Sequence, residues 1–141
     1  MGRPAPSIGL SRLRQNALMI ARLHHVVLDC PDPAALADFY SALLGTPVVY
    51  RSADWVVVAA NDTSSGLAFQ PVADYQPPDW PDPHRPQQFH LDLMVSDVAA
   101  ADSWVLGLGA RRLPSADPQS AVYADPAGHP FCLIPKPPWA A

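Results

Sequence analysis

Two histidines stand at the same point of a repeated segment. His25 begins the run His-Val-Val-Leu-Asp-Cys-Pro-Asp, and His90, 65 positions later, begins His-Leu-Asp-Leu-Met-Val-Ser-Asp. In each copy an alternating apolar run follows the histidine, and an aspartate closes the run at the same distance. Imidazole is a common metal ligand and a general acid or base near neutral pH. An internal repeat of this kind predicts a pseudo-symmetric fold that can bring both histidines to one cavity.

Alternation along the two repeated strands separates their residues into two faces. The more apolar face of each strand is expected to lie under a helix. His25 and Asp29 then share the opposite face of the first strand, and His90 and Asp92 share that of the second. Because an inward carboxylate needs a partner, a histidine–carboxylate pair is an alternative to a metal site. Either arrangement predicts a concave, partly polar cavity.

The segment after each repeat has the pattern of a short helix. Asp32 is a favourable N-cap before Pro33, and Gly45 fits the end of this helix. A second helix is expected to begin near Val98 and to end at Gly109. Turn-forming residues separate the expected strands, which we place at Leu23–Cys30, Pro47–Arg51, Trp55–Ala60, Gly66–Gln70, Phe89–Val95, Arg111–Leu113, Ala121–Ala124 and Pro130–Ile134.

This order of elements predicts an α+β fold made of two βαβββ modules. We place the modules at about residues 22–72 and 87–135. A proline-rich linker at 71–86 joins them, because prolines at this density exclude a central strand or a helix interior. Tyr75 and Trp80 in this linker either fold back over a pocket or cover edges of the core.

Composition excludes several classes of protein. The chain of 141 residues is 49% apolar and 16% charged, with a net charge of −4, so we expect a globular protein with no nucleic-acid partner. No apolar run is long enough to span a membrane. Two cysteines are too few for a disulfide framework and favour a cytoplasmic location. We expect one domain at 19–136, preceded by a flexible extension at 1–18; the alternative for the extension is a helix packed on a partner subunit.

Four motifs resemble the vicinal oxygen chelate superfamily, and its glyoxalase-like subgroup in particular. They are Leu67–Gln70, His90–Asp97, Leu108–Ala110 and Ala124–Cys132, and the resemblance covers about Ile20–Pro135. The superfamily contains glyoxalases, bleomycin- and fosfomycin-resistance proteins and extradiol dioxygenases. The resemblance implies that the two modules form a cupped, half-open barrel around one cavity. It also implies a homodimer.

The resemblance also implies positions for a divalent metal. The ligand on the first strand falls on His25, that on the fifth strand on His90, and the fourth corner falls near Gln70. The final-strand ligand, usually glutamate, falls on Cys132. Thiolate and imidazole favour zinc over magnesium or calcium. The alternatives are that Cys132 is a small core residue and that no metal binds.

Aromatic residues at matching places in the two modules are candidates for the walls of a ligand site. Trp55 and Tyr123 are the pair that these matching places suggest, although parity alone would make some of the aromatics core, and Asp29 and Asp92 complete the expected substrate-binding set. His129 has the opposite parity from His25 and His90, and we expect it to be structural or exposed.

Two functional hypotheses follow. The first is a glyoxalase-like enzyme that binds a small oxygenated molecule in the barrel cavity and acts as a metal-assisted lyase, isomerase or dioxygenase. The second is a non-catalytic protein that sequesters a small molecule, as the resemblance to bleomycin-resistance proteins allows. A domain whose site has decayed is a third possibility. Lactoylglutathione lyase activity is not expected, because Cys132 replaces the carboxylate that serves as the proton-transfer base in some isomerases of the superfamily.

Overall fold

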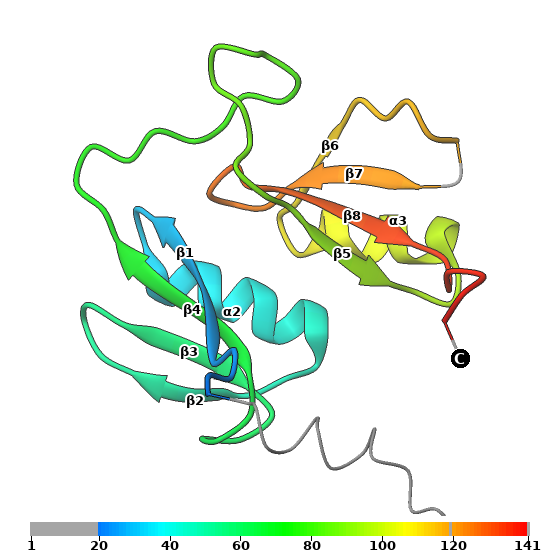
Figure 1. Cartoon of the computed structure of the whole chain (residues 1–141). Coiled ribbons are helices and arrows are strands. Elements are labelled where there is room, and N and C mark those ends of the chain that lie inside the picture. Colours follow the sequence, from blue (N-terminus) through cyan, green and yellow to red (C-terminus); the bar gives the residue numbers. More distant parts are fainter. Residues whose placement is uncertain (1–19, 119, 141) are drawn as a thin grey trace, which may run out of the picture.

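The computed structural model describes residues 20–118 and 120–140 (Figure 1). The expected N-terminal extension at 1–18 lies outside these residues. Within them, two helices and eight strands follow one another in the order βαβββ–βαβββ. The predicted α+β class and its two modules are therefore confirmed. Neither described helix is long and apolar enough to cross a membrane.

The first module is a four-stranded sheet with one helix. Its strands follow the order β1-β4-β3-β2, with β1 parallel to β4 and the other pairs antiparallel. Asp32 caps the helix as predicted, because its side chain accepts a hydrogen bond from the amide of Ala35, and Gly45 ends the helix at a φ of 61°. The elements are β1 (His25–Cys30), α2 (Pro33–Leu44), β2 (Val48–Arg51), β3 (Val56–Ala59) and β4 (Gly66–Pro71).

The second module repeats this plan. Its sheet has the order β5-β8-β7-β6, again with the first and last strands of the module parallel. Asp97 caps the helix through the amide of Ala100, in the same way as Asp32. The elements are β5 (Leu91–Met94), α3 (Val98–Gly107), β6 (Arg111–Leu113), β7 (Ala121–Ala124) and β8 (Pro130–Ile134). Strands β1 and β5 begin two residues later than the sequence suggested, at the first residues that have a partner in the ladder.

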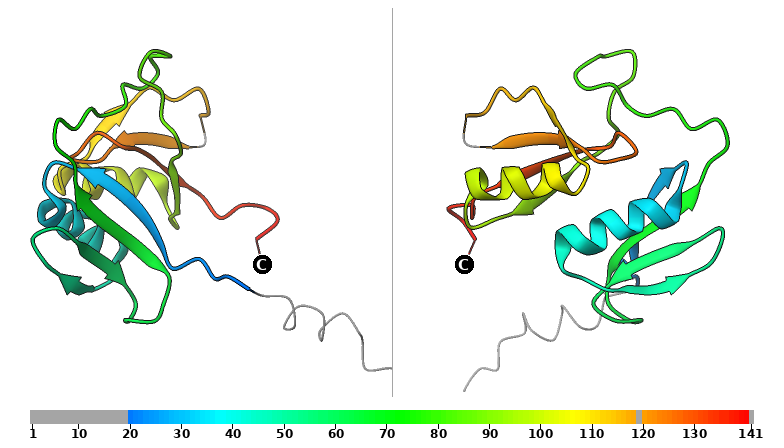
Figure 2. Two further views of the ribbon diagram at one scale, coloured as in Figure 1. Left: turned by 60° about the vertical axis from the view of Figure 1, so that its left-hand side comes forward. Right: turned by 180° about the vertical axis from the view of Figure 1, so that it is seen from behind.

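One hydrophobic core runs under both helices. Tyr40 of α2 stacks on Phe69 of its own module at 5.6 Å and lies 6.4 Å from the ring of Phe131 in the other. Phe39 contacts Phe131 as well, at 6.0 Å. The two helices lie on the same side of the molecule (Figure 2). The sheets lie side by side without closing, which is the half-open arrangement expected from the resemblance.

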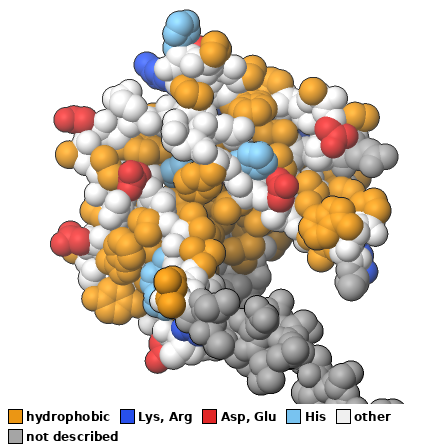
Figure 3. Space-filling model, in the orientation of Figure 1, with side chains coloured by type: hydrophobic (Ala, Val, Ile, Leu, Met, Phe, Trp, Pro, Cys, Tyr) orange, Lys and Arg blue, Asp and Glu red, His pale blue; other side chains and the backbone are white. Residues whose placement is uncertain are grey.

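The sheet faces that point away from the helices have separate, smaller clusters. In the first module, Val57 and Ala68 pack with Trp55; in the second, Val122 packs with Cys132 and with Trp80 of the linker. Figure 3 shows hydrophobic side chains over both modules on one face, with few Lys and Arg side chains among them. The modules therefore share a core on the helical side only.

The segment between the modules contains neither helix nor strand. It runs from residue 72 to residue 90 and passes over both modules (Figure 1). Its Trp80 donates a hydrogen bond from Nε1 to the carbonyl oxygen of Pro114, at 3.0 Å. Its Pro77 packs on the β7–β8 turn, since a Cβ added to Gly128 would lie 2.7 Å from the Cβ of Pro77. The linker is thus attached to the second module at two places.

Close packing of β3 on β4 gives a prediction about stability. A Cβ at Gly66 would lie 2.2 Å from the carbonyl oxygen of Val58, so Gly66→Ala should lower the free energy of unfolding by about 1–3 kcal/mol. Gly107→Ala is the matched control, because nothing lies within 4 Å of its added Cβ and alanine favours a helix. Urea unfolding measures both; equal stabilities for the two variants would contradict the described packing.

Candidate functional site

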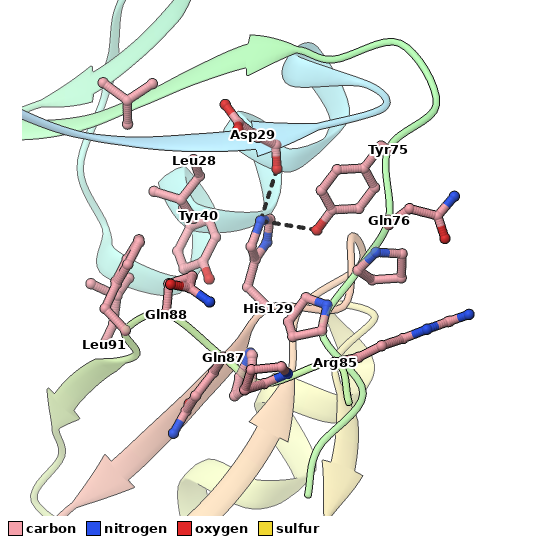
Figure 4. A pocket seen from close by; sticks show the side chains of 16 residues that line it. Leu28, Asp29, Tyr40, Tyr75, Gln76, Arg85, Gln87, Gln88, Leu91 and His129 are labelled. Carbon is pink, nitrogen blue, oxygen red and sulfur yellow. Dashed lines mark hydrogen bonds between the residues drawn. The ribbon is translucent and has the colours of Figure 1, made fainter. Parts of the chain in front are cut away.

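A cavity of about 520 Å³ lies between the two modules. Strand β1 and the helix α2 form one side of it, β5 and the turn before β8 form the other, and the linker covers it (Figure 4). Its walls are mainly apolar side chains and prolines, with a few polar groups among them. The lining residues are Val27, Leu28, Asp29, Tyr40, Tyr75, Gln76, Pro77, Pro78, Arg85, Pro86, Gln87, Gln88, Phe89, Leu91, His129 and Pro130.

A buried carboxylate lies beside this cavity. Asp125, in the turn between β7 and β8, is 4% exposed. Its Oδ1 accepts hydrogen bonds from the backbone amides of Ala127 and His129, at 2.9 and 3.0 Å. Its Oδ2 accepts one from the Tyr40 hydroxyl at 2.7 Å and lies 2.8 Å from Nδ1 of His129. These contacts compensate the carboxylate for its loss of water.

His129 connects this carboxylate to the cavity wall. Its Nε2 lies 2.8 Å from the backbone oxygen of Asp29 on β1 and 3.1 Å from the Tyr75 hydroxyl (Figure 4). The ring therefore contacts the second module through Asp125, the first module through β1, and the linker through Tyr75. An aspartate–histidine pair of this kind, turned toward a cavity, can orient a ligand or move a proton.

The tyrosines beside this pair are held in their protonated form. Burial raises the pKa of Tyr75 to about 12, and the negative charge of Asp125 adds to the effect. Burial and then the same carboxylate raise the pKa of Tyr40 well above its ordinary value. Both hydroxyls are therefore hydrogen-bond donors at neutral pH and not bases.

A second group of functional side chains lies on the non-helical face of the second module. Side-chain atoms of His90, Asp92 and Cys132 all lie within 4.8 Å of one another. The sheet explains this, because Asp92 and Cys132 are partners in the parallel β5–β8 ladder. His90 Nε2 is 3.3 Å from Asp92 Oδ1. Burial, then the charge of Asp92, raises the pKa of the Cys132 thiol to about 11, so a metal would displace its proton.

The expected ligands from the first module do not join this group. Among the described residues, the group does not contain His25. His25 stacks on His24 at 3.9 Å and approaches Trp55 edge-on at 6.2 Å. Partial burial, then the neighbouring His24, lower the pKa of His25. Gln70 donates a hydrogen bond from Nε2 to Asp29 Oδ1, at 2.6 Å, because the two residues are partners in the β1–β4 ladder.

The expected ligand-stacking aromatics lie elsewhere. Trp55 packs on the non-helical face of the first sheet, away from the cavity lining. Tyr123 is 0% exposed in the core, stacked on Phe131 at 5.5 Å, and its hydroxyl donates to Asp102 of α3 at 2.6 Å. Strand parity places Tyr123 on the helical face, since Val122 is on the other. Of the expected substrate-binding residues, Asp29 is the one that lines the cavity.

The sequence pattern did not identify the residues that meet at the cavity as parts of a site. Tyr40 has the spacing of a core position on its helix, Asp125 stands in a tight turn, and His129 follows that turn. One local feature of the sequence could have indicated this pair: an aspartate and a histidine four residues apart around a turn. Gly128 lies between them in that turn, at a φ of 95°. That signal identifies the pair but not the cavity, because its other walls come from distant segments.

Comparisons with known proteins agree with this architecture. A family model described as "Glyoxalase-like domain" matches residues 25–134. A glyoxalase-related enzyme from Fulvimarina pelagi superposes with a TM-score of 0.62 at 21% identity, over 84% of this chain and 90% of that one. A genomically encoded fosfomycin resistance protein from Listeria monocytogenes gives 0.63 at 16% identity, over 85% and 97%. The search of curated proteins found no match. At these identities the solved structures show the fold alone.

The buried contact between Tyr40 and Asp125 gives a prediction about the joining of the modules. Tyr40→Phe removes one donor to a buried carboxylate and should lower the free energy of unfolding by about 1.5–3 kcal/mol at pH 7. Tyr50→Phe, at an exposed tyrosine on β2, is the control and should change it by less than about 0.5 kcal/mol. Chemical denaturation measures both variants.

The comparison of the wild type with Tyr40→Phe also gives a prediction about pH dependence. The pKa of Tyr40 is higher in the folded chain than in the unfolded one, so its stabilising contribution is complete below the ordinary tyrosine pKa of about 10 and declines above it. The difference in unfolding free energy between the wild type and Tyr40→Phe should therefore be smaller at pH 11 than at pH 7. A difference that grows with pH would contradict the described burial of this hydroxyl.

Proposed function

The chain belongs to the glyoxalase-like domain family, and from this premise we propose that it binds a small oxygenated molecule in the cavity between its modules. The observation that carries the proposal is the cavity itself. Its volume of about 520 Å³ lies within the range of about 300–1,000 Å³ that small-molecule sites occupy. Apolar walls with a few fixed polar groups are the usual composition of such sites.

The polar groups of the cavity are fixed by contacts outside it. Asp125 and the β1 backbone hold His129, and His129 in turn positions the Tyr75 hydroxyl. The apolar walls come from elements that have their own place in the fold, such as Val27 and Leu28 on β1 and Leu91 on β5. The site is therefore largely pre-organised for a ligand, which reduces the entropy lost on binding.

A second function is favoured by the group of His90, Asp92 and Cys132. Imidazole, thiolate and carboxylate within 4.8 Å of one another suit zinc, which takes nitrogen, sulfur and oxygen ligands. A bound zinc ion would supply the Lewis-acid chemistry of a metal-assisted lyase or isomerase. A dioxygenase reaction would need a redox-active metal at this group instead, because zinc has no redox chemistry. This group lies on the other face of the strand from Leu91, so the binding proposal stands without it.

The binding proposal predicts which backbone amides respond when a small molecule binds. In two-dimensional NMR spectra, at least one of the single-ring probes benzoate, benzamide and benzyl alcohol should shift the amide resonances of Leu28, Leu91 and His129. The resonances of Trp55 and Val57, which lie outside the cavity lining, serve as the internal control.

A cavity variant makes this test specific. Val27→Phe narrows the cavity from a position that is already 37% exposed, so it should weaken binding of every probe without unfolding the chain. Val49→Phe, on β2 at the far edge of the same sheet and outside the lining, is the matched control. Shifts confined to Trp55 and Val57, or binding that Val27→Phe leaves unchanged, would overturn the proposal.

The metal proposal is tested by zinc binding to protein purified without a nickel column. The wild type should bind one equivalent of zinc, and His90→Ala and Cys132→Ser should each weaken this by at least about tenfold, as expected when a ligand is removed. His84→Ala, in the exposed linker, is the matched control and should bind as the wild type does. Equal zinc binding by His90→Ala and the wild type would contradict a site at this group.

A further inference from the structure

We infer that the cavity selects a small, mainly apolar molecule that carries an acceptor oxygen, a carboxylate or a carbonyl, which takes a hydrogen bond from the Tyr75 hydroxyl. This inference rests on the proposed binding function and names the ligand class for it. It follows from the direction in which the polar groups of the lining donate, and Figure 4 shows these groups together.

The first step concerns the hydrogens of His129. Its Nδ1 lies 2.8 Å from the carboxylate of Asp125, and its Nε2 lies 2.8 Å from the carbonyl oxygen of Asp29. A carbonyl oxygen cannot donate a hydrogen bond. Nε2 therefore has to donate to the Asp29 oxygen, so this nitrogen carries a hydrogen.

The second step concerns the hydroxyl of Tyr75. Its oxygen lies 3.1 Å from Nε2 of His129, a nitrogen that carries a hydrogen in this arrangement and offers no lone pair. The Tyr75 oxygen can accept from this nitrogen, but it cannot donate to it. Within residues 20–118 and 120–140 the hydroxyl has no other hydrogen-bond partner. Its own hydrogen is consequently available to a ligand, and its raised pKa keeps that hydrogen in place at neutral pH.

The third step concerns the charges around the cavity. Asp29 supplies the one acidic side chain of the lining, and its carboxylate is already bonded by Gln70. Figure 4 shows this carboxylate pointing away from His129. Arg85 lies in the lining and adds a positive charge. An anionic oxygen therefore meets one carboxylate that is already bonded and one positively charged side chain, Arg85.

A separate observation supports a polar ligand. Gln87 lines the cavity, and its side-chain oxygen is buried with no hydrogen-bond partner among the described residues. A buried polar atom without a partner costs free energy that a bound ligand can restore. Apolar walls such as Leu28 and Leu91 leave room for a ring or an aliphatic body next to these polar groups.

The test compares two probes of matched size and opposite polarity, benzoate and benzylamine. Benzoate presents acceptor oxygens, whereas benzylammonium presents only donors. Wild-type protein should bind benzoate at least about tenfold more tightly than benzylamine, measured by NMR titration of the His129 and Leu91 amides. Tyr75→Phe removes only the hydroxyl and should weaken benzoate binding about 10- to 100-fold, as loss of a hydrogen bond to a charged partner does. Tyr50→Phe, exposed on β2, should bind as the wild type.

The outcomes separate this inference from the binding proposal. If benzoate shifts the cavity amides equally in the wild type and in Tyr75→Phe, the inference fails and the binding proposal stands. The same holds if benzylamine binds in the cavity and neither benzoate nor benzamide does. If no probe shifts the cavity amides, both fail. Should Tyr75→Phe not fold, the comparison of benzoate with benzylamine on the wild type decides alone.

Discussion

The burial of one carboxylate constrains the rest of this structure. Asp125 is almost fully enclosed, so its charge requires partners within the protein. Two backbone amides of its own turn, the hydroxyl of Tyr40 and the ring of His129 supply them. Since Tyr40 belongs to the helix of the first module, its hydrogen bond to Asp125 also joins the two modules. It turns His129 toward β1 and the linker, and so places a polar group in the wall of the cavity.

Strand β5 links the two sites of the molecule. Leu91 faces the cavity, while His90 and Asp92 on either side of it belong to the group that contains Cys132. One strand therefore supplies an apolar wall to the first site and polar side chains to the second. This alternation means that a ligand in the cavity and a metal at the second group would lie on opposite faces of the same strand.

Local signals predicted the fold, whereas the site depends on how the modules pack. Asp32, Gly45 and Asp97 cap or end helices through contacts within a few residues, so the sequence shows them directly. His90 and Cys132 lie close together because β5 and β8 are neighbours in one sheet. His25 and Gln70 lie on the other sheet, and strand parity says nothing about how far apart two sheets stand. The importance of His129 follows only from the contact of its turn with α2, β1 and the linker.

The most direct measurement concerns the hydrogens on the His129 ring in the ligand-free protein. Long-range ¹H–¹⁵N correlation NMR distinguishes ring nitrogens that carry a hydrogen from those that do not. The contact of His129 with the Asp29 carbonyl predicts that Nε2 of His129 carries a hydrogen, which leaves the Tyr75 hydroxyl free to donate into the cavity. An unprotonated Nε2 that accepts from Tyr75 would contradict the account, because the cavity would then lack its free donor.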